Sequence, residues 1–163
     1  MRKRRPGTPS DMRLEIRPAK RTDAPRIHRL LAQLREITGI EGVAEERLVA
    51  QFERALSNPC FRAFVAEDEG EVKGLVTIWL RECLSHGGPV ALIDELIVAE
   101  GERGGGLGSR LLEHALAYCR QQGCVEVEIS TEAENAAARQ FYARHGFEET
   151  GVLLEREFEG GEA

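Results

Sequence analysis

The chain has 163 residues, of which 42% are apolar, and this length fits one compact domain rather than two independent cores. It contains no apolar run of about 18 residues, which argues against a membrane-spanning helix, and its basic beginning lacks the apolar stretch of a secretory signal. The formal net charge of −6 disfavours a nucleic-acid partner and suits a cationic substrate, so we expect a cytoplasmic protein with neither nucleic-acid nor membrane partners.

The beginning of the chain differs in charge from the rest. Four of the first five residues are basic, and we expect residues 1–11 to be a disordered tail before a single domain over residues 12–159. The four cysteines form no Cys-x-x-Cys pair, and the four histidines lack the i, i+4 spacing of a metal-binding helix. The sequence therefore predicts reduced thiols and no metal site.

Strand and helix patterns alternate in the first half of the chain. Alternating apolar and charged residues predict a half-buried strand over 12–17. Apolar residues at helical spacing predict one helix that ends at Gly39 and a second that ends before Pro59. Two β-rich segments, 61–67 and 72–80, are separated by a turn and predict a hairpin.

The second half predicts a strand-helix-strand crossover. The nearly continuous apolar run 90–98 is typical of a strand covered on both faces, and an amphipathic helix over 106–123 and a strand over 125–129 follow it. Such a unit forms a right-handed parallel crossover. A short helix from about Asn135 and two short strands around Gly151 complete the elements, and their order predicts an α/β fold.

A glycine-rich turn at residues 103–108 lies between the apolar strand and the amphipathic helix. Unpaired backbone N–H groups and the positive end of the helix dipole coincide there, so we expect an anion-binding site with Arg103 as a charged donor. A P-loop would need a Gly-Lys-Ser/Thr that does not follow, and a Rossmann fingerprint would need Gly or Ala where Leu111 stands. A nucleotide-binding module stays open as an alternative use of the turn.

The turn also resembles the signature Arg/Gln-x-x-Gly-x-Gly/Ala of the GNAT superfamily of N-acetyltransferases, through Arg103, Gly106 and Gly108. The strand at 93–98 and the segment 135–147 are similar to the same family, in the same order. The resemblance implies a GNAT fold of the α/β class. Such a fold has a central mixed, mostly antiparallel sheet of six to seven strands, a splayed parallel pair at the acyl-CoA cleft, and about four flanking helices.

The resemblance implies acetyl-CoA as the cosubstrate. The turn amides would hold the coenzyme pyrophosphate, the strand backbone would bind the pantetheine arm, and a downstream Asn would orient the coenzyme. Gly105 departs from the family pattern, in which a basic side chain is frequent. The predicted coenzyme-binding residues are Leu96, Ile97, Val98, Arg103, Gly104, Gly105, Gly106, Leu107, Gly108, Ser109, Asn135 and Tyr142.

Amide formation needs a neutral amine, a polarised carbonyl and a proton for the leaving thiolate. Tyr142 stands at the family position of the general acid, although its spacing alone also fits an aromatic core residue. Asp94 and Glu95 are the candidate bases, directly or through a water. Strand parity puts them on opposite faces unless a bulge intervenes, and we rank Asp94 first. His86, in the preceding loop, either reaches the acceptor site or is solvated.

The predicted function is transfer of an acetyl group from acetyl-CoA to a primary amine of a small molecule or peptide within a ternary complex. The alternative is a non-catalytic acyl-CoA-binding sensor or partner-binding module of the same fold, and the resemblance also allows a homodimer. The acceptor stays open. An acidic cluster at Glu41, Glu45 and Glu46 suits a cationic acceptor, but a helix N-terminus explains the last two equally well.

Overall fold

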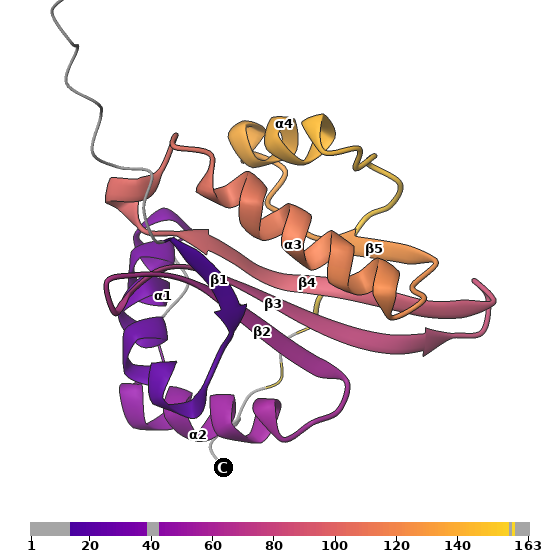
Figure 1. The fold of residues 1–163 in the computed structure, drawn as a ribbon. Coiled ribbons are helices and arrows are strands. Elements are labelled where there is room, and N and C mark those ends of the chain that lie inside the picture. Colours follow the sequence, from indigo (N-terminus) through magenta and orange to yellow (C-terminus); the bar gives the residue numbers. More distant parts are fainter. Residues whose placement is uncertain (1–13, 39–42, 157, 159–163) are drawn as a thin grey trace, which may run out of the picture. The chain divides into compact units, whose positions relative to one another are not determined.

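The computed structural model describes residues 14–38, 43–156 and 158, so the predicted tail lies outside the described residues. The chain divides into two compact units, residues 1–129 and 130–163. Five strands of the first unit form one sheet in the order β1-β2-β3-β4-β5 (Figure 1). These strands are β1 (Glu15–Pro18), β2 (Phe61–Asp68), β3 (Glu71–Cys83), β4 (Gly88–Val98) and β5 (Glu126–Ile129).

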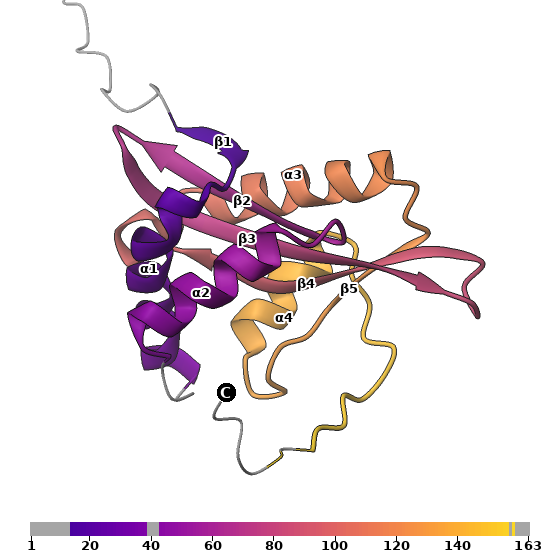
Figure 2. The ribbon, with the colours of Figure 1, turned by 90° about the horizontal axis from the view of Figure 1, so that it is seen from below.

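The helices of the first unit are α1 (Ala24–Thr38), α2 (Glu45–Leu56) and α3 (Leu107–Gln121), with short 3-10 helices at Arg21–Asp23 and Glu100–Glu102. In the ribbon views, α1 and α2 cover one face of the sheet and α3 covers the other (Figures 1 and 2). No helix in the described part of the chain is long and apolar enough to cross a membrane.

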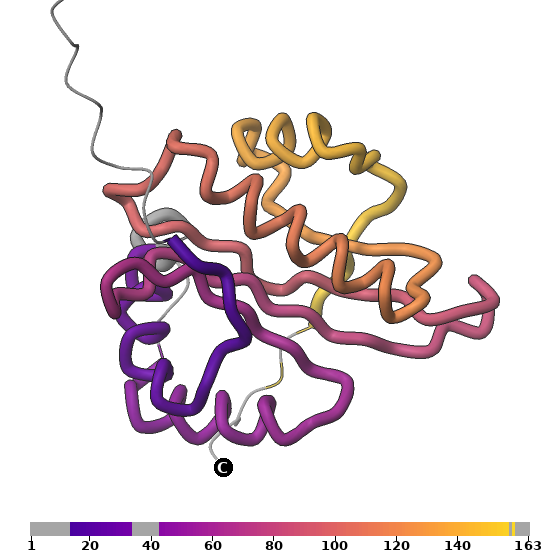
Figure 3. Tube along the Cα trace, viewed as in Figure 1, coloured from indigo at the N-terminus to yellow at the C-terminus, as the bar shows by residue number. Residues whose placement is uncertain are grey.

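The sheet is mixed but mostly antiparallel. Neighbouring strands from β1 to β4 pair antiparallel, and β4 pairs with β5 in parallel. The predicted hairpin forms, and Figure 3 shows how β3 and β4 run together as a second, longer hairpin. The α/β class, the mixed sheet and the four helices that the sequence predicts are therefore confirmed.

The parallel pair at the end of the sheet is short. Residues 90–93 of β4 pair with β5, whereas residues 96–98 pair with β3 alone among the described strands. β4 and β5 therefore separate after Ile93, and the edge of β4 beyond this residue has no parallel neighbour among the described strands. A backbone edge of this kind keeps N–H and C=O groups free for a ligand.

Side chains of β2 alternate between the two faces, as the pleat of a strand requires. Phe61, Ala63 and Val65 belong to the core cluster that also holds residues of α1 and α2. Phe64 points to the other side, where its ring centroid lies 4.6 Å from that of His114 and 5.4 Å from that of Tyr118, both on α3. The strand is thus buried on both faces.

Close approach of α3 to the sheet depends on Gly74 of β3. A Cβ atom at this position would lie 2.6 Å from Leu111 Cδ1 and 3.1 Å from the carbonyl oxygen of Ile97. Because a real Cβ does not tolerate the first distance, only glycine fits here without a shift of the helix or of the Leu111 side chain.

The second unit contains α4 (Ala136–Arg144). Asn135 caps this helix, because its side-chain oxygen accepts a hydrogen bond of 3.0 Å from the Ala138 N–H. The helix ends at Arg144, and Gly146 follows it with a φ of +85°, which only glycine adopts without strain. The Phe147 N–H then returns to the Tyr142 carbonyl at 3.1 Å.

The prediction of two short strands around Gly151, and with it a sheet of six to seven strands, is wrong for the described residues. The sheet has five strands, and residues 147–156 carry no strand. The apolar residues that favoured a strand are exposed, with Val152 at 87%, Leu153 at 66% and Leu154 at 89%. A strand forms only with a hydrogen-bonded neighbour, and no described strand pairs with this segment.

Candidate active site

The predicted anion-binding turn has an open helix N-terminus. The first helical hydrogen bond of α3 runs from the Arg110 N–H to the Gly106 carbonyl at 3.1 Å, so the N–H groups of Leu107, Gly108 and Ser109 have no helical acceptor. The first turn carries no acidic residue and no side-chain cap. The unpaired amides and the helix dipole therefore favour an anion at this end.

The glycines of the turn differ in what they require. Gly104 and Gly106 have φ values of +79° and +84°, which disfavour any residue with a Cβ. Gly105 has no such φ, and a Cβ there would meet only the Glu102 carbonyl oxygen, at 3.5 Å. Gly105 is thus the turn glycine that can be replaced by a side chain without backbone strain.

Arg103 links the turn to the end of β4. Its Nε donates a hydrogen bond of 3.2 Å to the Val98 carbonyl, and the side chain is exposed. A second basic residue, Arg110 on the first turn of α3, donates through Nη2 to the Leu14 carbonyl at 3.1 Å. Arg103 is therefore tied to the strand end by its inner nitrogen and stands in the chain just before the open amides.

The two candidate bases lie in a β-bulge of β4. Val76 of β3 pairs with Leu96 and Ile78 pairs with Ile93, so Asp94 and Glu95 together oppose the single residue Thr77. A bulge of two residues against one breaks the alternation of side chains along a strand. Both carboxylates consequently line the same pocket, and the expectation that they face opposite sides is corrected.

The pocket has a volume of about 200 Å³ and lies between the sheet and the helices α1 and α2. Its helical wall includes Ile27 and Leu31 of α1 and Phe52 and Ala55 of α2. Its sheet wall is largely apolar and aromatic, with Phe61, Leu75 and Trp79, beside the polar trio Thr77, Asp94 and Glu95. The pocket thus combines one acidic end with walls that are apolar apart from Gln51 of α2.

Glu95 is half-buried and held by Thr77 at two points. The Thr77 hydroxyl donates to a Glu95 carboxylate oxygen and accepts a hydrogen bond of 3.0 Å from the Glu95 backbone N–H. Burial raises the pKa of Glu95, and the negative charge of Asp94 adds to the rise, while the Thr77 hydrogen bond opposes it. A carboxylate with a raised pKa is a stronger base than an exposed one.

Asp94 lies beside Glu95 and is more exposed. Partial burial raises its pKa, and a hydrogen bond from the Trp79 side chain opposes the rise. The indole of Trp79 lines the pocket together with the two carboxylates. Neither Thr77 nor Trp79 was expected at the site, because only the pairing register of β3 with the bulge brings them there.

Tyr142 and Asn135 belong to the second unit, and their roles at the coenzyme stay predictions. The ring centroid of Tyr142 lies 5.3 Å from that of Phe141 and 5.8 Å from that of Phe147. Burial raises the pKa of Tyr142, and the charge of Glu132 adds to the rise. The phenol therefore keeps its proton at neutral pH, as a proton donor must.

His86 lies at the far end of the β3–β4 hairpin and does not line the pocket. Its Nδ1 is 2.8 Å from Cys83 Sγ, and its Nε2 is 3.3 Å from a carboxylate oxygen of Glu126. Cys83 pairs with Gly88, six residues before Asp94, which separates His86 from the carboxylates by about 20 Å of strand. The structure thus excludes His86 from the acidic pocket.

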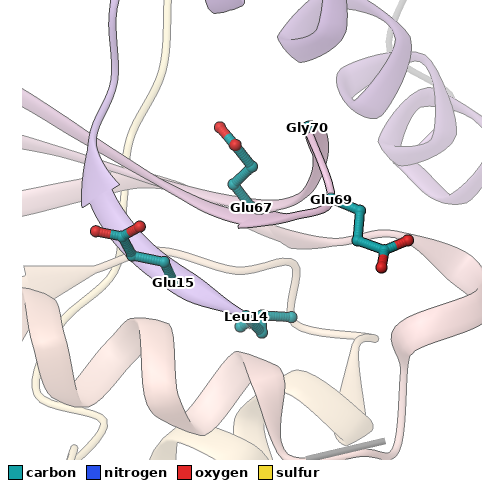
Figure 4. A pocket seen from close by; sticks show the side chains of 5 residues that line it. All are labelled: Leu14, Glu15, Glu67, Glu69 and Gly70. Carbon is teal, nitrogen blue, oxygen red and sulfur yellow. The ribbon is translucent and has the colours of Figure 1, made fainter. Parts of the chain in front are cut away.

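A second hollow lies at the β2–β3 turn (Figure 4), with a volume of about 530 Å³. Leu14, Gly70 and three carboxylates, those of Glu15, Glu67 and Glu69, line it. Glu67 already accepts a 2.9 Å hydrogen bond from Arg17 Nε, and in the described part of the chain no group of acidic, His or Cys residues is arranged to hold a metal ion. We place no function in this hollow.

Comparison with known proteins agrees with the turn and the fold. Residues 26–147 match the model of the acetyltransferase (GNAT) family. An uncharacterised N-acetyltransferase of Bacillus subtilis is 32% identical over 145 residues, which cover 86% of this chain and 94% of that protein. An aminoalkylphosphonate N-acetyltransferase of Salmonella typhimurium is 32% identical over 99 residues, 61% of this chain, and the match spans only 64% of that protein.

Among solved structures, an aminoglycoside N-acetyltransferase in complex with CoA superposes with a TM-score of 0.79 at 22% identity, covering 94% of this chain and 99% of the other. This likeness concerns the fold. Together with the family match, it confirms the predictions of the GNAT fold, of an acyl-CoA-dependent acetyltransferase and of acetyl-CoA as the cosubstrate. With its open α3 amides beside a parallel pair that separates after Ile93, the chain belongs to the acetyltransferase (GNAT) family.

Proposed function

We propose that the chain transfers an acetyl group from acetyl-CoA to the primary amine of a small molecule bound in the acidic pocket. The observation that carries the proposal is the position of β4. Its bulge presents Asp94 and Glu95 to the pocket, and its last residues lead through Arg103 to the open amides of α3. One strand thus connects an amine-binding end with an anion-binding end.

The coenzyme would bind along the second half of β4 and at the turn. The N–H groups of Leu107, Gly108 and Ser109 would donate hydrogen bonds to the pyrophosphate, with the outer nitrogens of Arg103 adding charge. The pantetheine arm carries amide groups, and the free edge of β4 at residues 96–98 offers matching backbone partners. This arrangement would place the thioester near the bulge.

At the pocket, the two carboxylates would divide the work. Asp94 is the more exposed, so it would attract and orient the incoming ammonium group. Glu95 is more buried and is fixed by Thr77, so it would take the proton from the ammonium, directly or through a water. This division ranks Glu95 before Asp94 as the base.

The transfer then balances in five changes. The neutral amine attacks the thioester carbonyl, a C–N bond forms, the attacking nitrogen releases one proton to water, the C–S bond breaks, and the leaving thiolate takes a proton. Tyr142 is the proposed source of that proton, because burial keeps its phenol protonated. The acceptor site supplies the base and also orients the amine toward the thioester carbonyl. Each of these contributions raises the rate only when the reacting atoms are aligned.

Calorimetric titration with acetyl-CoA, and separately with ATP and with NAD, tests the coenzyme half of the proposal. We expect acetyl-CoA to bind and the two nucleotides not to compete with it. Gly106→Glu should abolish binding, because it places a negative charge at the anion site. Ala117→Glu, on the exposed side of α3 about 15 Å along the helix, is the control and should bind normally.

Binding of ATP or NAD in preference to acetyl-CoA would contradict the proposal and favour a nucleotide-binding module. Consumption of the thioester in the presence of amines separates an enzyme from a non-catalytic sensor of the same fold. A sensor would bind acetyl-CoA with the same sensitivity to Gly106→Glu but release no CoA.

A further inference from the structure

The shape and chemistry of the acidic pocket restrict the acceptor. Building on the proposed function, we infer that the acceptor is a primary amine joined by a short linker to a compact apolar body, aromatic or branched aliphatic, and that it carries no phosphate group. The inference concerns the substrate class of the pocket between α1, α2 and the sheet, not the coenzyme turn.

Three polar side chains gather at one end of the pocket, and the other lining side chains are apolar or aromatic apart from Gln51 of α2. Asp94, Glu95 and Thr77 meet at the bulge, where an ammonium group would bind. The ring of Phe61 contacts both Phe52, at 6.5 Å between centroids, and Trp79, at 4.9 Å. An acceptor whose ammonium lies at the bulge therefore extends its remaining atoms along an aromatic and aliphatic wall.

The volume sets the size of that body. A dry apolar cavity of about 150 Å³ accepts a benzene ring. The pocket of about 200 Å³ accordingly holds a ring or a branched chain, a linker of one or two carbons and the amine. A several-ringed polycation or a phosphorylated sugar would extend out of this space, and the part inside it would lose hydrogen bonds to water against the apolar walls.

The charges act against phosphate and phosphonate groups. Two carboxylates line the pocket, and the side chains that line it in the described part of the chain include no basic residue. A phosphate placed here would meet like charge in a partly desolvated site, where repulsion is stronger than in water. The phosphonate named for the Salmonella relative is therefore not expected as part of the acceptor of this chain.

A matched pair of acceptors tests the inference, with phenylethylamine and aminoethylphosphonate as the probes. They share the same linker and amine and differ only in the phenyl or phosphonate group. With acetyl-CoA present, we expect kcat/KM for CoA release to be at least about 100-fold higher with phenylethylamine than with aminoethylphosphonate. The reason is that the pocket would have to desolvate the phosphonate charge without pairing it. A preference for aminoethylphosphonate, or for a phosphorylated amino sugar, would overturn the inference.

A pair of α2 variants ties the preference to this pocket. Ala55 lines it, whereas Ala50 of the same helix is exposed. Ala55→Leu should raise KM for phenylethylamine about tenfold while sparing ethylamine, because it fills the space for the ring. Ala50→Leu should leave both KM values unchanged. Equal effects of the two variants would show that the ring binds elsewhere.

Failure of the inference and failure of the proposed function give different results. Acetylation confined to phosphate-bearing or polyhydroxylated amines would overturn the acceptor class and leave the transfer intact. If none of the amines leads to release of CoA, the proposed acetyl transfer is contradicted. Calorimetric binding of phenylethylamine in the presence of CoA, lost in Ala55→Leu, would still support the pocket's chemistry, and its absence would overturn it.

A separate observation concerns the far end of the β3–β4 hairpin. Cys83 Sγ lies 2.8 Å from His86 Nδ1 and 3.3 Å from Ser85 Oγ, and the other ring nitrogen of His86 faces Glu126 at 3.3 Å. The geometry points to Cys83 as a thiol modification site that forms mixed disulfides with small disulfides. Cys83 is partly exposed, so such a reagent reaches it.

The chemistry of this second site balances without another reactant. His86 takes the thiol proton, and Glu126 stabilises the imidazolium. The Cys83 thiolate attacks one sulfur of the disulfide, a new S–S bond forms, the old one breaks, and the second half leaves as a thiolate. Hydrogen bonds from Ser85 and His86 lower the pKa of Cys83, and the paired thiolate raises the pKa of His86.

Cys60, which is exposed, is the internal control for this site. With oxidised glutathione followed by peptide mass spectrometry, we expect Cys83 to be modified about tenfold faster than Cys60. His86→Asn should bring the Cys83 rate down to that of Cys60, and Glu126→Gln should lower it in part. Equal rates in the native chain, or a Cys83 rate that His86→Asn leaves unchanged, would overturn the proposal.

Discussion

The charge of Asp94 influences the titration of Glu95, and this influence gives the proposed base a signature. The pKa of Glu95 is raised first by burial and further by the charge of Asp94. Since activity needs Glu95 ionised, kcat should fall as the pH drops through this raised pKa. Asp94→Asn removes one cause of the rise, so we expect the acid limb of the pH profile of kcat to move to lower pH.

Glu95→Gln serves as the comparison for that profile. It should lower kcat about 100-fold or more above the acid limb and leave acetyl-CoA binding intact, because it removes the base without touching the turn. An acid limb that stays in place in Asp94→Asn, or a Glu95→Gln enzyme of normal kcat, would contradict the assignment of Glu95.

Thr77→Val should act in the opposite direction to Asp94→Asn. The Thr77 hydroxyl stabilises the ionised form of Glu95 and thereby lowers its pKa. Its loss should move the acid limb to higher pH, as measured by kcat against pH with saturating amine. A shift of the same sign in both variants would indicate a structural change rather than titration of Glu95.

At the scale of elements, the start of α3 depends on its glycines. Gly106→Ala forces a side chain into a positive φ and disfavours the turn by about 1–2 kcal/mol, so acetyl-CoA affinity should fall roughly 5- to 30-fold. Gly105→Ala changes the neighbouring glycine, which has no positive φ, and should bind normally in calorimetry. Equal losses in the two variants would place the cause outside the backbone conformation.

The packing of α3 on the sheet gives a prediction for stability. Gly74→Ala should lower the free energy of unfolding by about 1–3 kcal/mol, because its Cβ would press on Leu111 and on the Ile97 carbonyl. Gly101→Ala, where a Cβ meets nothing within 4 Å, should change it by less than about 0.5 kcal/mol. Denaturant titration measures the free energy of unfolding of both variants. An unchanged value in Gly74→Ala would show that α3 shifts freely.

Local sequence patterns predicted the elements well where each pattern was long. The periodicities of β2, β3 and α3 each lie within one continuous segment, so these elements could be predicted. The turn before α3 is a local motif and could be predicted for the same reason. The bulge at Asp94 and Glu95 could not, because it is defined by pairing with Thr77 on another strand. The apolar residues after Gly151 suggested a strand, but apolar residues alone supply no hydrogen-bonding neighbour.

The pocket was harder to predict than the turn for a related reason. Its walls come from α1, α2, β2 and β3, whose side chains lie far from β4 in the sequence. Phe52 and Trp79 are indistinguishable from ordinary core residues until the fold brings them to the carboxylates. The sequence therefore indicated the acidic residues and an amine acceptor, while the apolar character of the acceptor pocket follows only from the three-dimensional arrangement.

At the scale of the first unit, an ion-pair cluster fastens β1 to the start of α1 and to β2. Asp23, whose side chain is 2% exposed, accepts hydrogen bonds from Arg17 at 2.8 Å and from the Lys20 N–H at 2.8 Å. Arg17 also bonds Glu67 of β2. Burial alone would raise the pKa of Asp23, but these hydrogen bonds outweigh it and lower the pKa below its usual 3.8.

Because the folded pKa is lowered, the cluster stabilises the fold fully above pH 3.8 and loses this contribution as the pH falls through the lower folded value. Asp23→Asn should therefore destabilise the protein by about 3–5 kcal/mol at pH 7, since it leaves Arg17 without its buried partner. The difference from the native chain should shrink below about pH 4 in thermal melts. A difference that does not depend on pH would contradict this role.

If β4 joins a coenzyme turn to an amine pocket, the protein should acetylate an amine, and this turnover can be measured. Purified protein would be mixed with acetyl-CoA and phenylethylamine, and both free CoA and the acetylated amine would be quantified by mass spectrometry. We expect equal amounts of the two products, a rate at least about 100-fold lower in Glu95→Gln, and no product in Gly106→Glu. Product formation that is unchanged in both variants would contradict this connection between the turn and the pocket.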